Sequence, residues 1–184
     1  MRKIALIIFY LLHIHFSYTQ IFGGNPPSLK WKQIKTDTAI IIFPEGLDNQ
    51  AQRVASIVHY LALHKPASLG NELRRINIVL QNQTTIANGF VALSPFRSEF
   101  FMTPDMNNFD QGSLPWDDQL AVHEYRHVMQ YNNFRNGLSE FMNILFGQDG
   151  LDLAINASVP NWFFEGDAVY NETILTNQGR GRLP

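Results

Sequence analysis

The sequence predicts an α+β domain, with a small sheet in the first half of the chain and helices in the second half. Short runs rich in Ile, Val and Phe, bounded by turn residues, fall between residues 39 and 103. Such runs are typical of strands. After Pro115, apolar residues instead recur at helical spacing. With 184 residues, 45% of them hydrophobic, the chain is long enough to bury one core.

The composition argues against three classes of protein. The chain has no cysteine, so it is neither a disulfide scaffold nor a lipoprotein anchored through a lipidated cysteine. Its 16 acidic residues against 14 Lys and Arg give a net charge of −2, which leaves no basic excess to neutralise phosphates. We therefore expect no nucleic-acid partner, and local motifs must indicate the function.

Residues 1–19 are predicted to be a secretory signal peptide. Arg2 and Lys3 precede an apolar run over residues 4–12, and Ser17 and Thr19 supply the small residues of a cleavage site. The run is shorter than the roughly 20 residues that span a bilayer, and a retained N-terminal anchor is the alternative. We expect a secreted, periplasmic or cell-surface protein.

The mature domain is expected to comprise residues 20–184. His13 and His15 leave with the signal peptide, so they are not candidate ligands. Residues 177–184 are rich in Gly and Arg and follow the last predicted helix without an element to pack on. We therefore expect the domain to be incomplete at its C-terminus and the natural polypeptide to continue beyond Pro184.

The first half contains four predicted strands and one helix. The first strand ends at the turn Pro44-Glu45-Gly46, and Asn88-Gly89 precedes the third. Between the first two strands, apolar residues at helical spacing predict a helix that Asn49 can cap. The predicted strands are residues 39–43, 76–80, 90–93 and 98–103, and the predicted helix is 49–64.

The second half contains three predicted helices. The first has Asp117 and Asp118 in its first turn, where the helix dipole favours acidic residues. Gly147 ends the second helix and a loop follows at residues 148–150. The helices are predicted at residues 116–131, 139–146 and 160–170.

The first of these helices carries the motif His123-Glu124-x-x-His127. Four residues are about one helical turn, so both imidazoles project from one face and can bind a single zinc ion. Glu124 lies beside them without being a ligand, which is the position of a general base. The alternative is that two core or exposed histidines neighbour an unrelated glutamate.

A third zinc ligand is expected from a later helix. Gln130 and Asn133 occupy the places of the glycine and third histidine of the metzincin pattern, which excludes that pattern. Glu165 is our choice, because aromatic neighbours would anchor its helix and Gly166 and Ala168 would allow close approach to the zinc helix. The rival ligands are Glu140, Asp149, Asp152 and Glu172.

The motif together with Pro160-x-Trp162-Phe163-x-Glu165-Gly166-x-Ala168-x-Tyr170 resembles the gluzincin metallopeptidases, specifically the peptidase MA-like group of secreted bacterial proteins. The resemblance covers nearly the whole mature chain. It implies a zincin (thermolysin-like) fold, in which a mixed sheet lies above the zinc helix and its edge strand pairs with an extended peptide. It also implies one Zn²⁺ on His123, His127 and Glu165, with Glu124 as general base.

This resemblance implies peptide-bond hydrolysis. Zinc held by two neutral histidines and a carboxylate keeps a fourth position for water and lowers the pKa of that water. Glu124 would take the proton of the attacking water and pass it to the leaving nitrogen. Tyr170 is our choice for the group that stabilises the oxyanion; Arg126 is the alternative, although an ion pair is expected to occupy it.

Two other functions stay open. One is a catalytically weak peptidase-like domain that acts as a binding or scaffold module at the cell surface, and longer members of the group continue into β-propeller repeats that could be its partner. The other is a metal-binding module that is not a peptidase.

His59 and His64 are expected to have packing or helix-dipole roles. Phe96, Phe100 and Phe101 with Arg97 are expected in the core, or else along a substrate groove.

Overall fold

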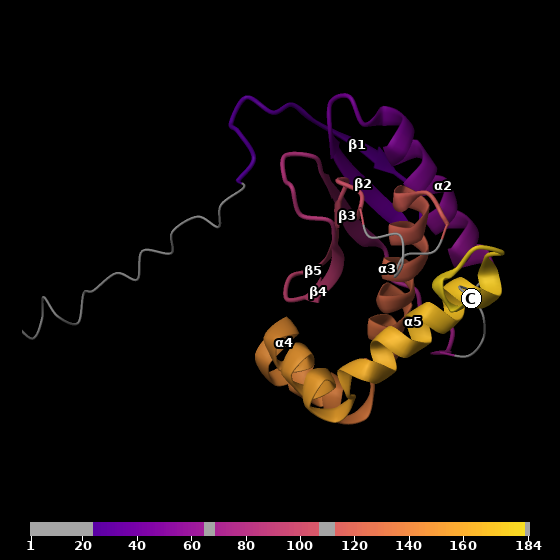
Figure 1. Cartoon of the computed structure of the whole chain (residues 1–184). Helices are drawn as coiled ribbons and strands as arrows, with labels where there is room; N and C mark the ends of the chain where they lie inside the picture. The colour runs from indigo at the N-terminus through magenta and orange to yellow at the C-terminus, as the bar shows by residue number, and fades with distance from the viewer. Residues whose placement is uncertain (1–23, 65–68, 107–112, 183–184) are drawn as a thin grey trace, which may run out of the picture.

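A computed structural model of the chain describes residues 24–64, 69–106 and 113–182. The predicted signal peptide lies outside these residues. Within them the chain is a mixed α/β fold with a five-stranded sheet and four helices (Figure 1). None of these helices is both long and apolar enough to cross a membrane. The elements are β1 (Trp31–Lys35), β2 (Ala39–Pro44), α2 (Asp48–Leu63), β3 (Ile76–Gln81), β4 (Gly89–Leu93), β5 (Phe96–Phe101), α3 (Trp116–Asn133), α4 (Gly137–Ser158), α5 (Asn161–Leu175) and the 3₁₀ helix η2 (Arg180–Arg182).

The sheet is mixed, with strand order β1-β2-β3-β5-β4. The three central strands are parallel, whereas β1 and β4 run antiparallel to their single neighbours. The turn Ser94–Pro95 joins β4 to β5, and Leu93 faces Phe96 across it. Since β4 pairs only with β5 in the described sheet, one of its edges carries no strand.

One face of the sheet is buried and supports the helices. Alternate residues of β2 and β3 point to this face, as expected for strands with period two. There they pack with the apolar stripe of α2 and with α3 in one core. The strand residues in this core include Ala39, Ile41, Phe43, Ile76, Ile78, Leu80 and Phe100.

Helix α3 is the centre of the molecule. It contacts α2 on one side, β4 and β5 of the sheet, and α5 beyond (Figure 1). Every residue from Gln119 to Gln130 is buried. A helix enclosed on all sides holds its side chains in fixed positions, which suits a helix that carries a site.

Three strands and the helix of the first half confirm the predicted elements, but β1 was not predicted. Its residues are largely exposed, because it is an edge strand that covers only one neighbour. β5 begins at Phe96 rather than Ser98, directly after the turn that closes the hairpin. Helix α2 begins at Asp48, and no side chain caps it, so the expected cap by Asn49 is wrong.

The predictions for the chain after α3 need two corrections. Gly147, with φ +66°, kinks α4, but residues 148–150 continue as helix, so the predicted loop is wrong. Gly150, in the second helical segment, packs closely on the backbone of Met142 in the first. Residues 177–182 do have an element to pack on, because η2 folds back against α5.

Candidate metal centre

His123 and His127 lie one turn apart on α3, and their imidazole rings face each other. The two Nε2 atoms are 3.2 Å apart, and the ring planes are nearly perpendicular. Only 7% of His123 and 6% of His127 is exposed. The helical spacing therefore brings the two nitrogens together as the motif predicts.

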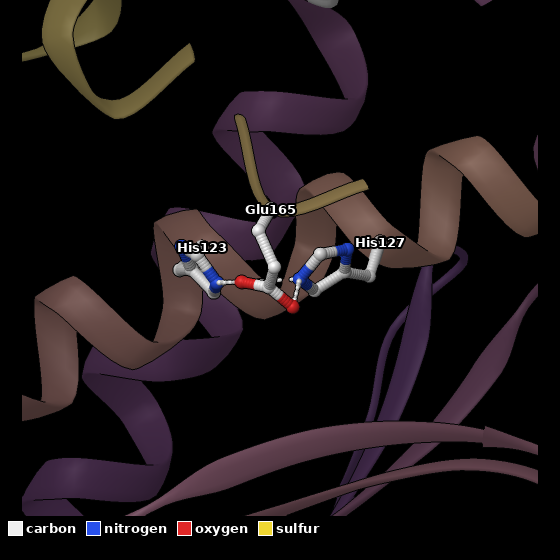
Figure 2. A group of neighbouring side chains, drawn as sticks. All are labelled: His123, His127 and Glu165. Carbon is white, nitrogen blue, oxygen red and sulfur yellow. Dashed lines mark hydrogen bonds and ion pairs between the residues drawn. The ribbon is translucent and has the colours of Figure 1, made fainter. Parts of the chain in front are cut away.

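Glu165 of α5 brings a carboxylate to the same point. Its Oε2 lies 3.3 Å from Nε2 of His123, and its Oε1 lies 3.6 Å from Nε2 of His127 (Figure 2). One ligand atom from each of the three residues falls within 4.8 Å of the others, so the group could hold a metal ion. About half of the Glu165 side chain is exposed, which leaves an open side to the group.

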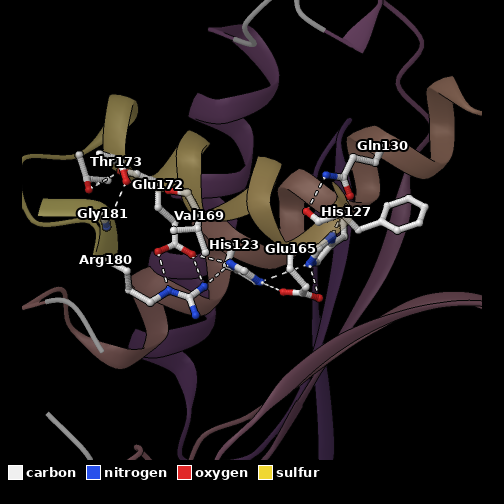
Figure 3. Close-up of polar contacts among 11 residues, drawn as sticks. His123, His127, Gln130, Glu165, Val169, Glu172, Thr173, Arg180 and Gly181 are labelled. Atoms are coloured by element: carbon white, nitrogen blue, oxygen red, sulfur yellow. Dashed lines mark hydrogen bonds and ion pairs between the residues drawn. The ribbon is translucent and has the colours of Figure 1, made fainter. Parts of the chain in front are cut away.

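The remaining ring nitrogens are held from behind. Nδ1 of His123 contacts the carboxylate of Glu172, and Nδ1 of His127 is 2.8 Å from Oε1 of Gln130 (Figure 3). Because Oε1 of Gln130 only accepts, Nδ1 of His127 donates to it and the lone pair of the neutral ring stays on Nε2. Nδ1 of His123 contacts Nη2 of Arg180 as well as the carboxylate of Glu172, and a metal on Nε2 requires the tautomer in which Nδ1 donates to that carboxylate. Both imidazoles are thus oriented as metal-ligating histidines are.

The charges of the cluster favour a cation between the rings. Burial lowers the pKa of His123, but the contacts with Glu165 and Glu172 outweigh this effect and raise the pKa to about 9. Burial and the charge on His123 lower the pKa of His127. One positive charge is therefore stabilised at this point, and a divalent cation bound to neutral imidazoles satisfies the same carboxylates.

Glu124 lies beside the two histidines without sharing their contacts. Its residue is 5% exposed, and its Oε2 is a buried oxygen without a hydrogen-bond partner among the described residues. Burial raises the pKa of Glu124 to about 7. A buried carboxylate left unpaired is costly, so such an oxygen calls for a proton donor at the site. The unpaired Oε2 also fits a metal site in which three protein ligands leave one position for water.

The cluster lies in an open cleft of about 280 Å³ between α3, α5 and the free edge of β4. Phe90 and Val91 of β4 line one wall. Phe96, Phe100 and Phe101 do not line this cleft; Phe100 is in the core, and β4 rather than β5 is the strand at the edge. The other lining residues are Ala87, Asn88, Gly89, Trp116, Gln119, Leu120, His123, Glu124, His127, Tyr131, Asn161, Phe164, Glu165 and Arg180.

The structure does not bring Tyr170 into this cleft. Tyr170 is 63% exposed and is not among the lining residues. It follows Glu165 by about one and a half turns, which places it on another face of α5. Arg126 forms the predicted ion pair, since its Nε and Nη2 donate to the two oxygens of Asp167 at 2.7 and 2.8 Å.

The rival ligands other than Glu172 lie elsewhere in the fold. Glu140 pairs with Arg135, Asp149 with Ser94, and Asp152 accepts from Asn156. His59 on α2 and His64 at its end are exposed, away from the cleft.

The close approach expected at Gly166 is wrong. A Cβ placed there meets nothing within 4 Å. Ala168, in contrast, is fully buried, so the expected small-residue contact holds at that position alone.

The sequence does not predict the four residues that support the metal ligands. The sequence offers Glu172 only as a rival ligand, and it does not point to Gln130, Asp167 or Arg180. Glu172 lies two turns beyond Glu165 on the same helix, a spacing that could have indicated a shared face. Arg180 belongs to a segment without a helical or strand pattern, and no sequence signal indicates its place.

Comparison with known proteins gives no relative. No protein-family model, no curated protein and no solved structure matches this chain.

Proposed function

We propose that this chain is a zinc-dependent peptidase, with His123, His127 and Glu165 as metal ligands and Glu124 as general base. The observation that supports it most is the buried Oε2 of Glu124, which has no hydrogen-bond partner among the described residues, next to three converging ligand atoms. A binding site needs the three ligands, but only a reaction needs a base beside them.

The donor set argues for the kind of metal. Two imidazole nitrogens and one carboxylate are the ligands of catalytic zinc sites that keep a fourth position open. When bound, zinc would polarise the substrate carbonyl and lower the pKa of a coordinated water. Glu124, His123, His127 and Glu165 all line the cleft, so substrate and base would meet at the metal.

The protein residues would then move one proton. Glu124 takes a proton from the attacking water and delivers it to the leaving nitrogen of the peptide bond. Burial raises the pKa of Glu124 to about 7 without metal, and the charge of a bound zinc would lower it, which would keep the carboxylate ionised and able to accept a proton at neutral pH. Tyr170 is exposed, so it could stabilise the oxyanion only if bound substrate changed its surroundings.

The substrate we propose is an extended peptide. Among the described residues no strand pairs with the outer edge of β4, which lines the cleft, and an extended chain can pair with such an edge as an added strand. A mixed sheet above a helix with two histidines is also what a thermolysin-like zincin would have. We therefore propose that fold family, and we propose that residues 1–19 direct export to the periplasm or cell surface.

A binding or scaffold module is the second candidate, because α4 and the start of α5 expose unusually large apolar side chains. Phe141, Ile144 and Phe146 are 54%, 71% and 63% exposed, and Trp162 is 73% exposed. Exposed apolar surface of this kind often marks an interaction site. This function would need the metal site for structure only and would not need Glu124.

The test is a peptidase assay on a general protein substrate, with metal content measured on the same samples. We expect the wild type to cleave and Glu124→Gln to retain the zinc while losing at least about a hundredfold in rate, because the amide keeps the size but not the basic oxygen. Equal rates for both proteins would exclude the peptidase mechanism. A wild type that binds zinc but does not cleave would favour the scaffold function.

The export proposal has its own test. N-terminal mass analysis of the protein made in a bacterial host should show a chain that begins near Gln20. A species that retains Met1 in the membrane fraction would contradict cleavage.

A further inference from the structure

The residues after α5 form a turn that packs tightly against that helix. Gly179 lies so close that a Cβ there would come within 2.5 Å of the backbone oxygen of Glu172. The amide of Gly181 donates to Oγ1 of Thr173 at 3.2 Å (Figure 3). The two glycines thus allow the turn to lie directly on α5, which only residues without a side chain can do.

Two arginines leave this turn in different directions. Arg182 donates from Nε to the backbone oxygens of Thr173 and Thr176 at the end of α5, at 3.0 and 3.1 Å. Carbonyls at a helix end lack helical partners, so this contact caps the helix. Arg180 points instead toward the metal centre and lines the cleft.

Arg180 holds Glu172 with two nitrogens. Its Nε lies 3.0 Å from Oε2, and its Nη2 lies 2.5 Å from Oε1. The Glu172 side chain is fully buried, and its Oε1 contacts Nδ1 of His123. Nη2 of Arg180 also contacts this Nδ1. The guanidinium therefore fixes the carboxylate that in turn fixes the ring of a metal ligand, as the chain of contacts in Figure 3 shows.

Glu172 alone would hold this ring less firmly. Its side chain has rotatable bonds, and without a second partner its carboxylate could turn away from His123. A planar guanidinium that binds both oxygens removes this freedom. The position of Arg180 also depends on a residue well outside the motif, because Gly179 allows the turn to lie on α5.

We propose that Arg180 is a positioning residue of the metal centre, which acts through Glu172 to hold His123 in the orientation that binds metal. This inference rests on the proposed metal-binding function. Loss of such support at other metal sites costs about 10–100-fold in metal affinity. We expect the same range here for Arg180→Gln and for Glu172→Gln.

The experiment measures zinc dissociation constants by competition with a chelator, on the full chain. Arg182→Gln is the matched control, because it removes an arginine of the same turn whose hydrogen bonds go to the end of α5 rather than to the site. Gly179→Ala is a second variant that keeps every site side chain and only pushes the turn away from α5. The absorption spectrum of the Co²⁺ form reports ligand geometry independently of affinity.

We expect Arg180→Gln and Gly179→Ala to bind zinc about 10–100-fold more weakly and to change the Co²⁺ spectrum. Arg182→Gln should bind with nearly the affinity of the wild type. Equal affinities and spectra for Arg180→Gln and Arg182→Gln would overturn the inference while leaving the peptidase proposal intact. If Arg180→Gln does not fold, unchanged affinity in folded Gly179→Ala overturns it. A wild type that binds no zinc would overturn both proposals.

Discussion

Gly89 of β4 lies directly on Glu124 of α3. A Cβ placed on Gly89 would come within 2.7 Å of Oε1 of Glu124 and 2.8 Å of Leu120. Real Cβ atoms essentially never make contacts this short, so the glycine is what lets the edge strand approach the helix that carries the motif. The contact joins the proposed peptide-binding edge to the proposed base, two parts of the site that lie far apart in sequence.

Gly89→Ala should therefore disturb the base more than the metal ligands. The added methyl group would push the Glu124 carboxylate from its place, whereas its nearest neighbours do not include His123 or His127. We expect kcat/KM to fall by about 10–100-fold, because misplacement of a catalytic group by about 1 Å has costs of this size. Zinc content should stay that of the wild type. Normal kcat/KM in a folded Gly89→Ala protein would show that the contact is not needed.

Gly166→Ala is the matched glycine variant, and it should stabilise the protein. Gly166 lies inside α5, where an added methyl group would have nothing within 4 Å, and alanine favours a helix over glycine by about 0.5–1 kcal/mol. We expect a melting temperature higher by about 1–4 °C, with unchanged zinc content. A lower melting temperature would indicate a contact at Gly166 that the structure does not have.

Asp167→Ala should cost much more stability than loss of an exposed acidic residue. It removes an ion-pair partner of Arg126, which is 1% exposed, and also an acceptor for Gln130, which holds His127. Breaking a fully buried ion pair by removing one partner costs about 3–5 kcal/mol, and because Asp167 is only partly buried the lower end of this range applies. Urea denaturation should therefore show a loss of about 3 kcal/mol. Asp48→Ala, which breaks an exposed pair with Lys32, is the control and should leave the unfolding free energy nearly unchanged. Equal effects would contradict the role of the buried pair.

Metal removal should lower the stability of the wild type but not that of a ligand variant. A ligand present at about 100 times its dissociation constant stabilises the folded state by about 2.7 kcal/mol. A chelator should then lower the melting temperature by about 5–10 °C. The same treatment of His127→Ala should have little effect, because that protein lacks one of the three ligands. An equal shift in both proteins would place the stabilising metal elsewhere.

The parts of the site that the sequence predicts are those set by local geometry. His123 and His127 face each other because four residues make about one turn, whatever surrounds the helix. Glu165 could be chosen because its segment combines aromatic anchors with small residues, and the structure brings it to both rings. The short apolar runs likewise predict the buried strands, since strands β2 and β3 alternate toward one core.

The parts that the sequence does not predict depend on contacts between distant segments. β1 is an edge strand whose mostly exposed residues have no apolar pattern, so only its pairing with β2 defines it. Arg180 reaches Glu172 because the turn after α5 folds back, and no residue pattern in the turn specifies that direction. Tyr170 is a different case, because its spacing of about one and a half turns from Glu165 already indicates another face of α5, and the structure leaves it exposed.

The most direct test of the proposed metal centre is the metal content of the purified chain, measured by elemental analysis for the wild type and for Glu165→Ala. The three converging ligand atoms predict one zinc per chain in the wild type. Removal of one of three protein ligands should leave well under one zinc per chain in Glu165→Ala. A wild type that binds no zinc, or a Glu165→Ala protein that retains a full equivalent, would contradict the proposed metal centre.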